Sequence, residues 1–217
     1  MYKIVAIDGP SGSGKGTVAK EVAKRLGFTY IDTGAMYRCV ALKSLRENLS
    51  EHDHDKIVDL LKNMDIRLTN DGKVYMDSED VSEDIRTMET THRVSKISSI
   101  IPLREIMRKK QREMAEKDNI VMEGRDITTE VFPDAKYKIF LDASLDERVR
   151  RRYKQNMEKG IKCTIEEVKA AIEERDYDDT HRPSGSLTRT DEQIYIDSTN
   201  MPIEEVVETM INIVEGE

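Results

Sequence analysis

A glycine-rich stretch near the N-terminus has the composition with which proteins bind phosphate. Its nine residues are Gly9, Pro10, Ser11, Gly12, Ser13, Gly14, Lys15, Gly16 and Thr17. Glycines let successive backbone N–H groups point inward at an anion, and the N-terminus of a following helix adds its positive end. We therefore expect the stretch to bind a nucleoside triphosphate, with Lys15 as a catalytic residue that reaches the terminal phosphates.

The residues on either side decide between this interpretation and a glycine-rich turn without a ligand. Residues 3–8 form a short apolar run, which is typical of a buried parallel strand. Val18, Val22 and Leu26 then follow at helical spacing. The stretch thus lies between a strand and a helix, which is the setting of a phosphate-binding loop, and nucleotide binding is favoured.

The end of the stretch departs from the common form of such loops. Gly16 follows Lys15 directly, and the hydroxyl comes one position later, at Thr17. Where Ser or Thr follows the lysine, its hydroxyl usually binds Mg²⁺. We expect Thr17 to contact a phosphate instead and Mg²⁺ to be held mainly by ATP oxygens and water, so no residue is assigned as a metal ligand. A Gly-Lys-Gly-Thr ending resembles the nucleoside monophosphate kinases, which indicates small-molecule phosphoryl transfer.

Composition limits the classes of protein to which the chain can belong. Its 217 residues suffice for one domain with one core, and 36% of them are charged. No run approaches the roughly 20 apolar residues that span a bilayer, so we expect no membrane partner. The net charge of −8 argues against nucleic-acid binding, which needs a positive surface. Two cysteines without metal-ligand spacing fit a reducing compartment, and we expect a cytoplasmic monomer.

Short apolar segments alternate with helical patterns along the chain. The predicted strands are residues 3–8, 28–32, 120–122, 137–142 and 194–197. Their alternation with helices predicts an α/β fold with a five-stranded parallel sheet flanked by helices. Asn70-Asp71-Gly72 lies between two short apolar runs and predicts an antiparallel hairpin over residues 65–76. Ligands of parallel sheets bind beyond the carboxyl ends of the strands, where Asp8, Asp32 and Glu123 fall.

Basic residues are numerous enough to serve a reaction between two anions. Phosphoryl transfer from ATP to a nucleoside monophosphate brings about six negative charges together. The attacking phosphate is mostly ionised at pH 7, so the reaction needs cations and exclusion of water more than it needs a general base. The chain offers Lys15, Arg38, Arg104, Arg125, Arg148, Arg151, Arg152, Arg175 and Arg182.

Three of these arginines fall on one face of a predicted helix. Arg148, Arg151 and Arg152 are spaced by three and four positions. One alternative is a solvated face with salt bridges to Asp146 and Glu147. Because the chain also contains a phosphate-binding loop, we favour a lid that closes over the nucleotides. A second helix is predicted from residue 164 to about 176, followed by a mobile loop over residues 179–189.

The motifs together resemble one family. Residues 7–17 (IDGPSGSGKGT), 32–38 (DTGAMYR), 80–86 (DVSEDIR) and 124–126 (GRD) look like those of bacterial-type cytidylate kinases. The match continues through residues 132–135 (FPDA), 140–144 (FLDAS) and 174–176 (ERD). The resemblance covers nearly the whole chain, and the set of motifs is far more specific than the phosphate-binding loop alone.

The resemblance implies a phosphate-loop (P-loop) kinase core with a helical lid and an enlarged monophosphate-binding insertion that contains the hairpin. Residues 1–217 would form one kinase domain, with a core of about residues 1–40, 87–147 and 190–217. The insertion would span about residues 41–86 and the lid about residues 148–189. ATP with Mg²⁺ would be the donor, and CMP or dCMP the acceptor, in direct in-line transfer.

The resemblance also assigns roles by motif position. Ser95, Arg104 and Asp126 would read the cytosine edge, and Thr33, Arg38, Arg125 and Arg182 would hold the acceptor phosphate. Asp179 and Arg175 would meet the sugar hydroxyls, while Arg148, Arg151 and Arg152 would close over the transferring phosphoryl group as catalytic residues. A serine, an arginine and a carboxylate can satisfy the amino, ring-nitrogen and carbonyl groups of cytosine, whereas adenine would be poorly matched.

Some positions depart from the family pattern or keep alternatives open. Thr128 stands where the family usually has glycine, which would alter local backbone freedom, and residues 177–182 are less regular than the core motifs. Glu123 could position Mg²⁺ through water, bind the acceptor sugar or form a salt bridge with an arginine.

Three other functions remain as alternatives. The nearest is a kinase of another monophosphate, such as UMP or AMP, or of a small alcohol. A nucleotide-dependent switch protein is less favoured, because the Asn-Lys-x-Asp motif of guanine recognition is absent from the sequence. A nucleic-acid ATPase is less favoured still, given the acidic balance, no tryptophan and three phenylalanines for stacking.

Overall fold

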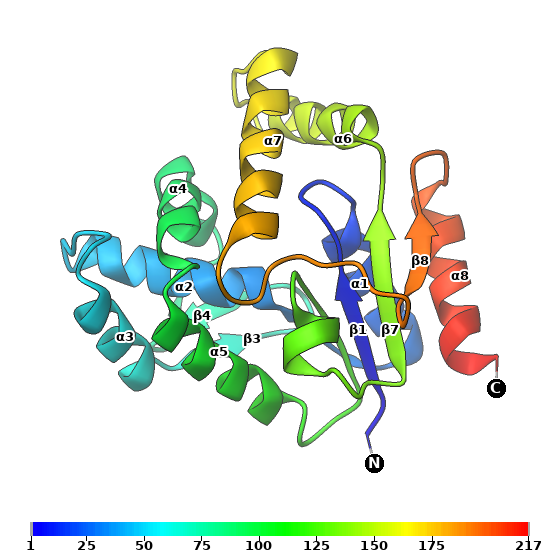
Figure 1. The fold of residues 1–217 in the computed structure, drawn as a ribbon, viewed down its shortest axis with the longest axis horizontal. Coiled ribbons are helices and arrows are strands. Elements are labelled where there is room, and N and C mark those ends of the chain that lie inside the picture. Colours follow the sequence, from blue (N-terminus) through cyan, green and yellow to red (C-terminus); the bar gives the residue numbers. More distant parts are fainter. Residues whose placement is uncertain (1, 217) are drawn as a thin grey trace.

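The computed structural model describes residues 2–216, which contain a five-stranded parallel sheet. Its strands are β1 (Ile4–Asp8), β2 (Thr29–Asp32), β6 (Ile120–Gly124), β7 (Tyr137–Asp142) and β8 (Ile194–Asp197), in the spatial order β2-β6-β1-β7-β8. All four strand pairings are parallel. The predicted α/β fold is confirmed, and the central strand β1 leads directly into the glycine-rich stretch (Figure 1).

Apolar side chains leave the strands toward both faces of the sheet. Ile7 of β1 packs with Val18 of α1 (Lys15–Leu26) and Val206 of α8 (Ile203–Glu215). Its neighbour Ala6 points to the other face and packs with Ile127 of the π-helical turn η2 (Ile127–Val131). Successive side chains of a strand point to opposite faces, so a strand covered on both faces is apolar throughout. This is why the strands appear in the sequence as continuous apolar runs.

A second apolar cluster lies beside the sheet and combines four helices with a small antiparallel sheet. The helices are α2 (Thr33–Arg46), α3 (His54–Asn63), α4 (Met88–Ile97) and α5 (Ile101–Met114). The small sheet consists of β3 (Ile66–Leu68), β4 (Val74–Met76) and β5 (Glu79–Asp80), and the short 3₁₀ helix η1 (Asp84–Arg86) follows it. The predicted hairpin is confirmed. The sequence did not predict β5, because Glu79 and Asp80 are both polar and pair through the backbone alone.

The tip of the hairpin is fastened to the core at two points. The Nζ of Lys20 in α1 donates to the backbone oxygen of Asp71 at 2.7 Å. The side-chain oxygen of Asn70 accepts from the backbone N–H of Tyr30 in β2 at 3.1 Å. The Asn-Asp-Gly turn therefore both reverses the chain and attaches the small sheet to the elements that hold the phosphate-binding loop.

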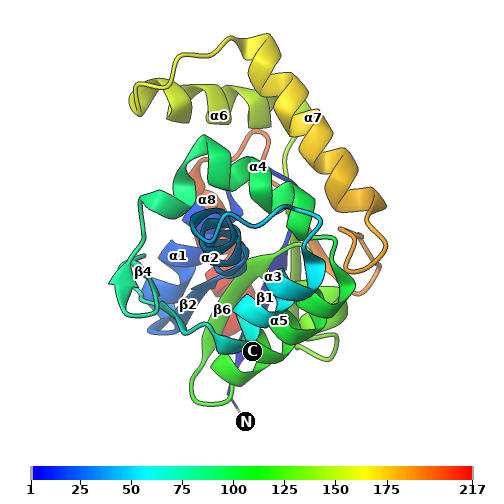
Figure 2. The same cartoon turned by 90° about the vertical axis from the view of Figure 1, so that its left-hand side faces the viewer.

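Two helices form an arm above the carboxyl ends of the strands. In Figure 1, α6 (Leu145–Glu158) lies above the arrowheads of β1 and β7, and α7 (Ile165–His181) descends beside its far end. Figure 2 shows the pair projecting beyond the rest of the molecule. Thr164 and Glu167 form the predicted capping box at the start of α7. The helix continues to His181 instead of ending near residue 176, because the buried carboxylate of Asp179 is bound to arginines that hold the last turn. Within the described residues, no helix is long and apolar enough to cross a membrane.

Gly9 occupies a point where β1 passes too close to β7 for any side chain. A Cβ built at Gly9 would lie 2.0 Å from the backbone oxygen of Leu141. We expect Gly9→Ala to lower the free energy of unfolding by about 3 kcal/mol, because backbone atoms of a central strand must move. Urea unfolding followed by circular dichroism measures the loss. Gly27→Ala is the matched control, since a Cβ there meets no atom within 4 Å and only the strain of a positive φ, about 1 kcal/mol, applies. Equal losses in the two variants would contradict the steric argument.

Candidate active site

A cavity of about 1500 Å³ lies where the carboxyl ends of the strands meet α6 and α7. Residues 11–17 of the phosphate-binding loop form one wall. The other walls carry a high density of positive charge from Arg38, Arg86, Arg104, Arg125, Arg151, Arg152, Arg175 and Arg182. Of the remaining predicted residues, Thr33 and Asp126 also line the cavity, while Ser95, Arg148 and Asp179 lie behind the lining and contact it. The structure therefore brings together residues spread over most of the chain.

Lys15 begins α1 and lies buried at the floor of the cavity. Its ammonium group donates to the backbone oxygen of Pro10 at 3.0 Å. Burial, followed by the positive charge of Arg125, lowers the pKa of Lys15, whereas Glu123 opposes this shift. A bound phosphate would favour the charged form of Lys15, so the pKa of this group rises when an anion binds.

We expect ATP binding to take up a proton at alkaline pH. The pKa of Lys15 in the free protein is lowered from 10.5, and a neighbouring triphosphate raises it because opposite charge favours the ammonium form. Between the lowered and the restored pKa, Lys15 gains a proton on binding, so affinity for ATP falls as pH rises through this interval.

Isothermal titration calorimetry in two buffers of different ionisation enthalpy, at about pH 9, measures this proton uptake. Lys15→Arg is the matched variant, because arginine keeps the cation but stays protonated throughout. Uptake that persists undiminished in Lys15→Arg would assign the proton to another group.

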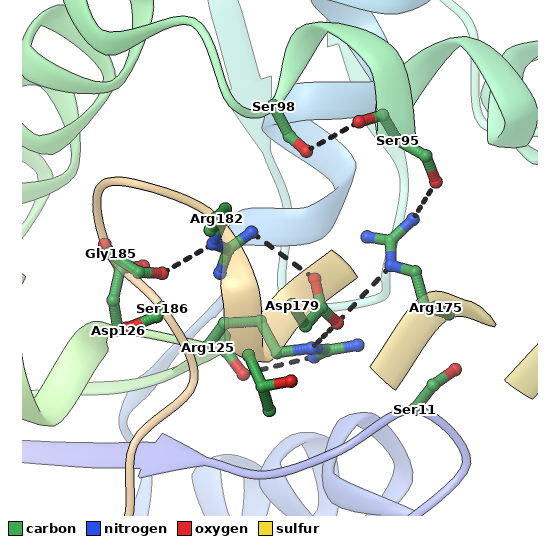
Figure 3. Close-up of polar contacts among 12 residues, drawn as sticks. Ser11, Ser95, Ser98, Arg125, Asp126, Arg175, Asp179, Arg182, Gly185 and Ser186 are labelled. Carbon is green, nitrogen blue, oxygen red and sulfur yellow. Dashed lines mark hydrogen bonds and ion pairs between the residues drawn. The ribbon is translucent and has the colours of Figure 1, made fainter. Parts of the chain in front are cut away.

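Asp179 collects three guanidinium groups near the end of α7. Its carboxylate accepts from Arg125 Nε at 2.6 Å, from Arg175 Nε at 3.4 Å and from Arg182 Nη1 at 3.3 Å (Figure 3). Burial would raise the pKa of Asp179, but the three arginines outweigh it and hold this pKa well below its usual range. One carboxylate cannot neutralise three cations, so the cluster keeps a net positive charge that suits a phosphate dianion.

Arg104 and Asp126 form a buried ion pair beside this cluster. Nη2 of Arg104 donates to the Asp126 carboxylate at 2.6 Å, and the two side chains are 1% and 8% exposed. Nη1 of Arg104 donates to the backbone oxygen of Ser98 at 2.9 Å, and its guanidinium lies 5.6 Å from the ring centre of Tyr37. Among residues 2–216, the buried Nε–H of Arg104 has no hydrogen-bond partner. The pair thus offers both charge signs and a free donor to the edge of a base.

Ser95 and Thr33 lie where they tie elements together. The hydroxyl of Ser95 in α4 accepts from Nη1 of Arg175 in α7 at 3.1 Å. The hydroxyl of Thr33, the first residue of α2, donates to the backbone oxygen of Glu123 at 2.8 Å. Both side chains are therefore already oriented by contacts to other predicted site residues.

The arginine face of α6 points toward the phosphate-binding loop. Nη1 of Arg148 donates to the backbone oxygen of Ser11 at 3.0 Å and to Asp176 at 2.5 Å. Arg151 donates to the backbone oxygen of Ser13 at 3.1 Å and also pairs with Glu147. The alternative of a salt-bridged face is realised in part, because Arg151 pairs with Glu147, as does the neighbouring and largely exposed Arg150.

Sequence reasoning assigned no role to Arg86 or Asp176. Within residues 2–216, Arg86 and Arg38 line the cavity without a hydrogen bond or ion pair, so both guanidinium groups remain available to an anion. The signal for Arg86 was its place in the motif of residues 80–86. The carboxylate of Asp176 accepts from the backbone N–H of Ser11 at 3.3 Å, which no sequence pattern indicates.

Glu123 lies buried at the end of β6, beside the residue that follows Lys15. Its Oε1 is 3.2 Å from the position that a Cβ of Gly16 would take, and it accepts a long 3.5 Å hydrogen bond from the hydroxyl of Tyr30. Burial, followed by the charge of Asp32, raises the pKa of Glu123. No salt bridge to Glu123 occurs in the part of the chain that the structure describes, so that alternative for its role is not realised.

Comparison with known proteins identifies the family. The family model for cytidylate kinase matches residues 5–216. A cytidylate kinase of Caldanaerobacter subterraneus subsp. tengcongensis is 52% identical over 94% of this chain and 91% of its own length. One of Desulforamulus reducens is 47% identical over 99% of this chain and 97% of its own. A shikimate kinase from Bacteroides thetaiotaomicron, at 16% identity, TM-score 0.51 and 98% coverage of both chains, shares the fold. The chain belongs to the cytidylate kinase family.

Proposed function

We propose that the protein transfers the γ-phosphoryl group of ATP to CMP and dCMP, giving CDP and dCDP in pyrimidine nucleotide metabolism. The observation that carries this proposal is one cavity that holds both the phosphate-binding loop and the buried Arg104–Asp126 pair. The loop suits a triphosphate, and the pair suits the polar edge of cytosine. Membership of the cytidylate kinase family supports the same acceptor.

The reaction needs positioning and positive charge more than proton transfer. With a second pKa of about 6, the acceptor phosphate is already a nucleophile at pH 7. Arg38, Arg125 and Arg182 would hold this phosphate, and Lys15 would contact the transferring group from below. Charge that spreads over the transferring oxygens is then stabilised by groups fixed before the reaction begins.

Residues of about 148–189, which contain most of α6 and all of α7, would act as the lid, and residues of about 41–86 would form the acceptor insertion. Val149, Val168 and Ile172 give the two helices a small apolar cluster of their own. Their contacts to the phosphate-binding loop are polar, through Arg148 and Asp176. Elements held to a core by few apolar contacts are the ones that open locally, which suits a lid.

Mg²⁺ would accompany ATP and neutralise its phosphate oxygens. Carboxylate oxygens and water are the ligands that this ion prefers. Glu123 offers a buried carboxylate beside Gly16, where other loops of this kind place a hydroxyl. We therefore assign Glu123 to orient metal-bound water, with the phosphates as the main ligands.

The walls of the cavity come from one chain, which includes the loop, the acceptor arginines and α6. We infer that the protein acts as a monomer, since no second copy is needed to complete the site. Its nucleotide substrates would place it in the cytoplasm. Light scattering at the concentration of the assay tests the oligomeric state.

A coupled assay over CMP, dCMP, UMP, AMP and shikimate tests the proposed function. We expect CMP or dCMP to give the highest kcat/KM, with UMP as the nearest rival. Fastest turnover with any other acceptor refutes the proposal. Tight GTP binding without phosphorylation of a monophosphate would instead favour a switch protein.

A further inference from the structure

A buried chain of hydrogen bonds joins three segments that are distant in sequence. The carboxylate of Asp8, at the end of β1, accepts from the backbone N–H of Ile127 at 2.9 Å and of Thr128 at 2.8 Å. It also accepts from the hydroxyl of Thr128 at 2.5 Å, and that hydroxyl accepts from Nε2 of Gln193 at 2.5 Å. Asp8, Thr128 and Gln193, here called the relay, are 0%, 3% and 8% exposed.

The bonds of the relay fix the orientation of each member. The amide nitrogen of Gln193 only donates, so the Thr128 hydroxyl accepts from it and directs its own proton to the Asp8 carboxylate. The amide oxygen of Gln193 accepts from the backbone N–H of Thr190 at 2.7 Å, which orients the amide in turn. Loss of one member therefore removes a buried hydrogen bond from its neighbour and loosens the orientation of that neighbour.

The relay connects the two segments that carry the acceptor contacts. On one side, Ile127 and Thr128 directly follow Arg125 and Asp126. On the other side, Gln193 ends the segment that begins at Arg182. This segment passes over the Arg104–Asp126 pair at Gly185, whose backbone oxygen accepts from Arg182 Nε at 2.6 Å (Figure 3). The relay thus sets how far the two segments lie apart.

We infer that Thr128 and Gln193 are positioning residues for the acceptor nucleotide, acting through Asp8 and the backbone of residues 125–128. The inference rests on the proposed function, because it concerns the acceptor half of that site. Neither side chain lines the cavity, so neither touches a nucleotide. Lys15 and the phosphate-binding loop do not depend on Thr128 or Gln193 for any hydrogen bond. Loss of the Thr128 hydroxyl or of the Gln193 amide should therefore raise KM for the acceptor and leave KM for ATP nearly unchanged.

Three variants test the relay from both ends. Gln193→Ala removes the amide, Thr128→Val removes the hydroxyl at similar volume, and Thr128→Ser keeps the hydroxyl. For Gln193→Ala and Thr128→Val we expect KM for CMP to rise about tenfold, as for one lost buried hydrogen bond, with kcat and KM for ATP within about twofold. Thr128→Ser should stay close to the wild type. If Thr128→Val does not fold, Gln193→Ala and Thr128→Ser still decide the question.

Val214→Ala is the control for a purely structural effect. Val214 is buried in α8, within the apolar cluster on the α1 side of the sheet, and belongs to none of the three segments that the relay joins. Equal rises of KM for CMP and ATP in Gln193→Ala would overturn the inference. It would also fail if Val214→Ala, at a similar loss of Tm, changed KM for CMP as much, or if Thr128→Ser behaved like Thr128→Val.

The wild type in the same assay separates this inference from the proposed function. If the wild type turns over another monophosphate faster than CMP, the proposed function fails. KM for that acceptor is then compared with KM for ATP in each variant. The inference holds if only KM for the acceptor rises. If the wild type prefers CMP but the variants change KM for CMP no more than KM for ATP, only the inference about the relay is refuted.

Discussion

Lys15→Ala is expected to lower kcat by about a thousandfold, since a preorganised charge at the transferring group contributes on the order of 10² to 10³ or more. The ammonium group is buried at the floor of the cavity and is bonded to the loop that would hold the triphosphate. Within such a site water cannot replace it, so the charge on the transferring oxygens would be left without its nearest cation.

Stability separates this effect from simple unfolding. Because burial lowers the pKa of Lys15, the charged group opposes folding, and the free energy of unfolding from this group rises with pH from the lowered pKa toward 10.5. Removing the lysine should leave the melting temperature at neutral pH unchanged or raise it. Lys24→Ala, an exposed lysine on the same helix, is the matched control and should keep full activity. Retention of more than about a tenth of the wild-type kcat in Lys15→Ala would refute its catalytic role.

Arg104→Ala is expected to reduce the preference for CMP over UMP by about 10²-fold, because sites built to hydrogen-bond a base discriminate most strongly through those bonds. Cytosine and uracil differ at the amino group and the ring nitrogen, which are the atoms that an arginine–carboxylate pair can tell apart. KM for ATP should change little, since Arg104 contacts Asp126 and Ser98 and not the phosphate-binding loop.

The same substitution removes the closest cation of the buried Asp126 carboxylate and leaves Arg108 Nη1 at 4.0 Å. We expect a loss of about 3 kcal/mol in the free energy of unfolding, as for other broken buried ion pairs. Arg112→Ala is the matched control, since Arg112 lies on the same helix and bonds to the backbone of Glu130 and Val131. Arg104→Lys keeps the charge without the planar fork and should restore stability more than specificity. Equal losses of kcat/KM for CMP and UMP in Arg104→Ala would contradict a base-reading role.

The elements that could be predicted from sequence follow local rules. The inner strands β1 and β6 are apolar up to the polar residues near their carboxyl ends because both faces are covered. Those carboxyl ends bring the polar motifs together at one rim. The turn at residues 70–72 and the capping box at Thr164 and Glu167 need only a few neighbouring residues to form. Motif spacing likewise indicated the phosphate-binding loop and most of the arginines that line the cavity.

The features that escaped prediction depend on contacts between distant segments. The last turn of α7 is held by ion pairs of Asp179, one of them to Arg125, 54 positions earlier. Thr128 replaces the glycine expected there without adopting a positive φ, so the backbone freedom of glycine is not needed at this position. Its bonds to Asp8 and Gln193 reach across 120 and 65 positions, where no local pattern can reveal them.

The two hydrogen bonds at the hairpin tip attach one side of the cavity to the core more firmly than the other side. Lys20 of α1 and Tyr30 of β2 each form a hydrogen bond to the tip of the hairpin. The hairpin therefore cannot move away from the core without breaking both bonds. The arm of α6 and α7 contacts the loop through polar contacts at Ser11 and Ser13 instead. We therefore expect nucleotides to enter and leave on the side of α6 and α7, while the side of the hairpin stays fixed.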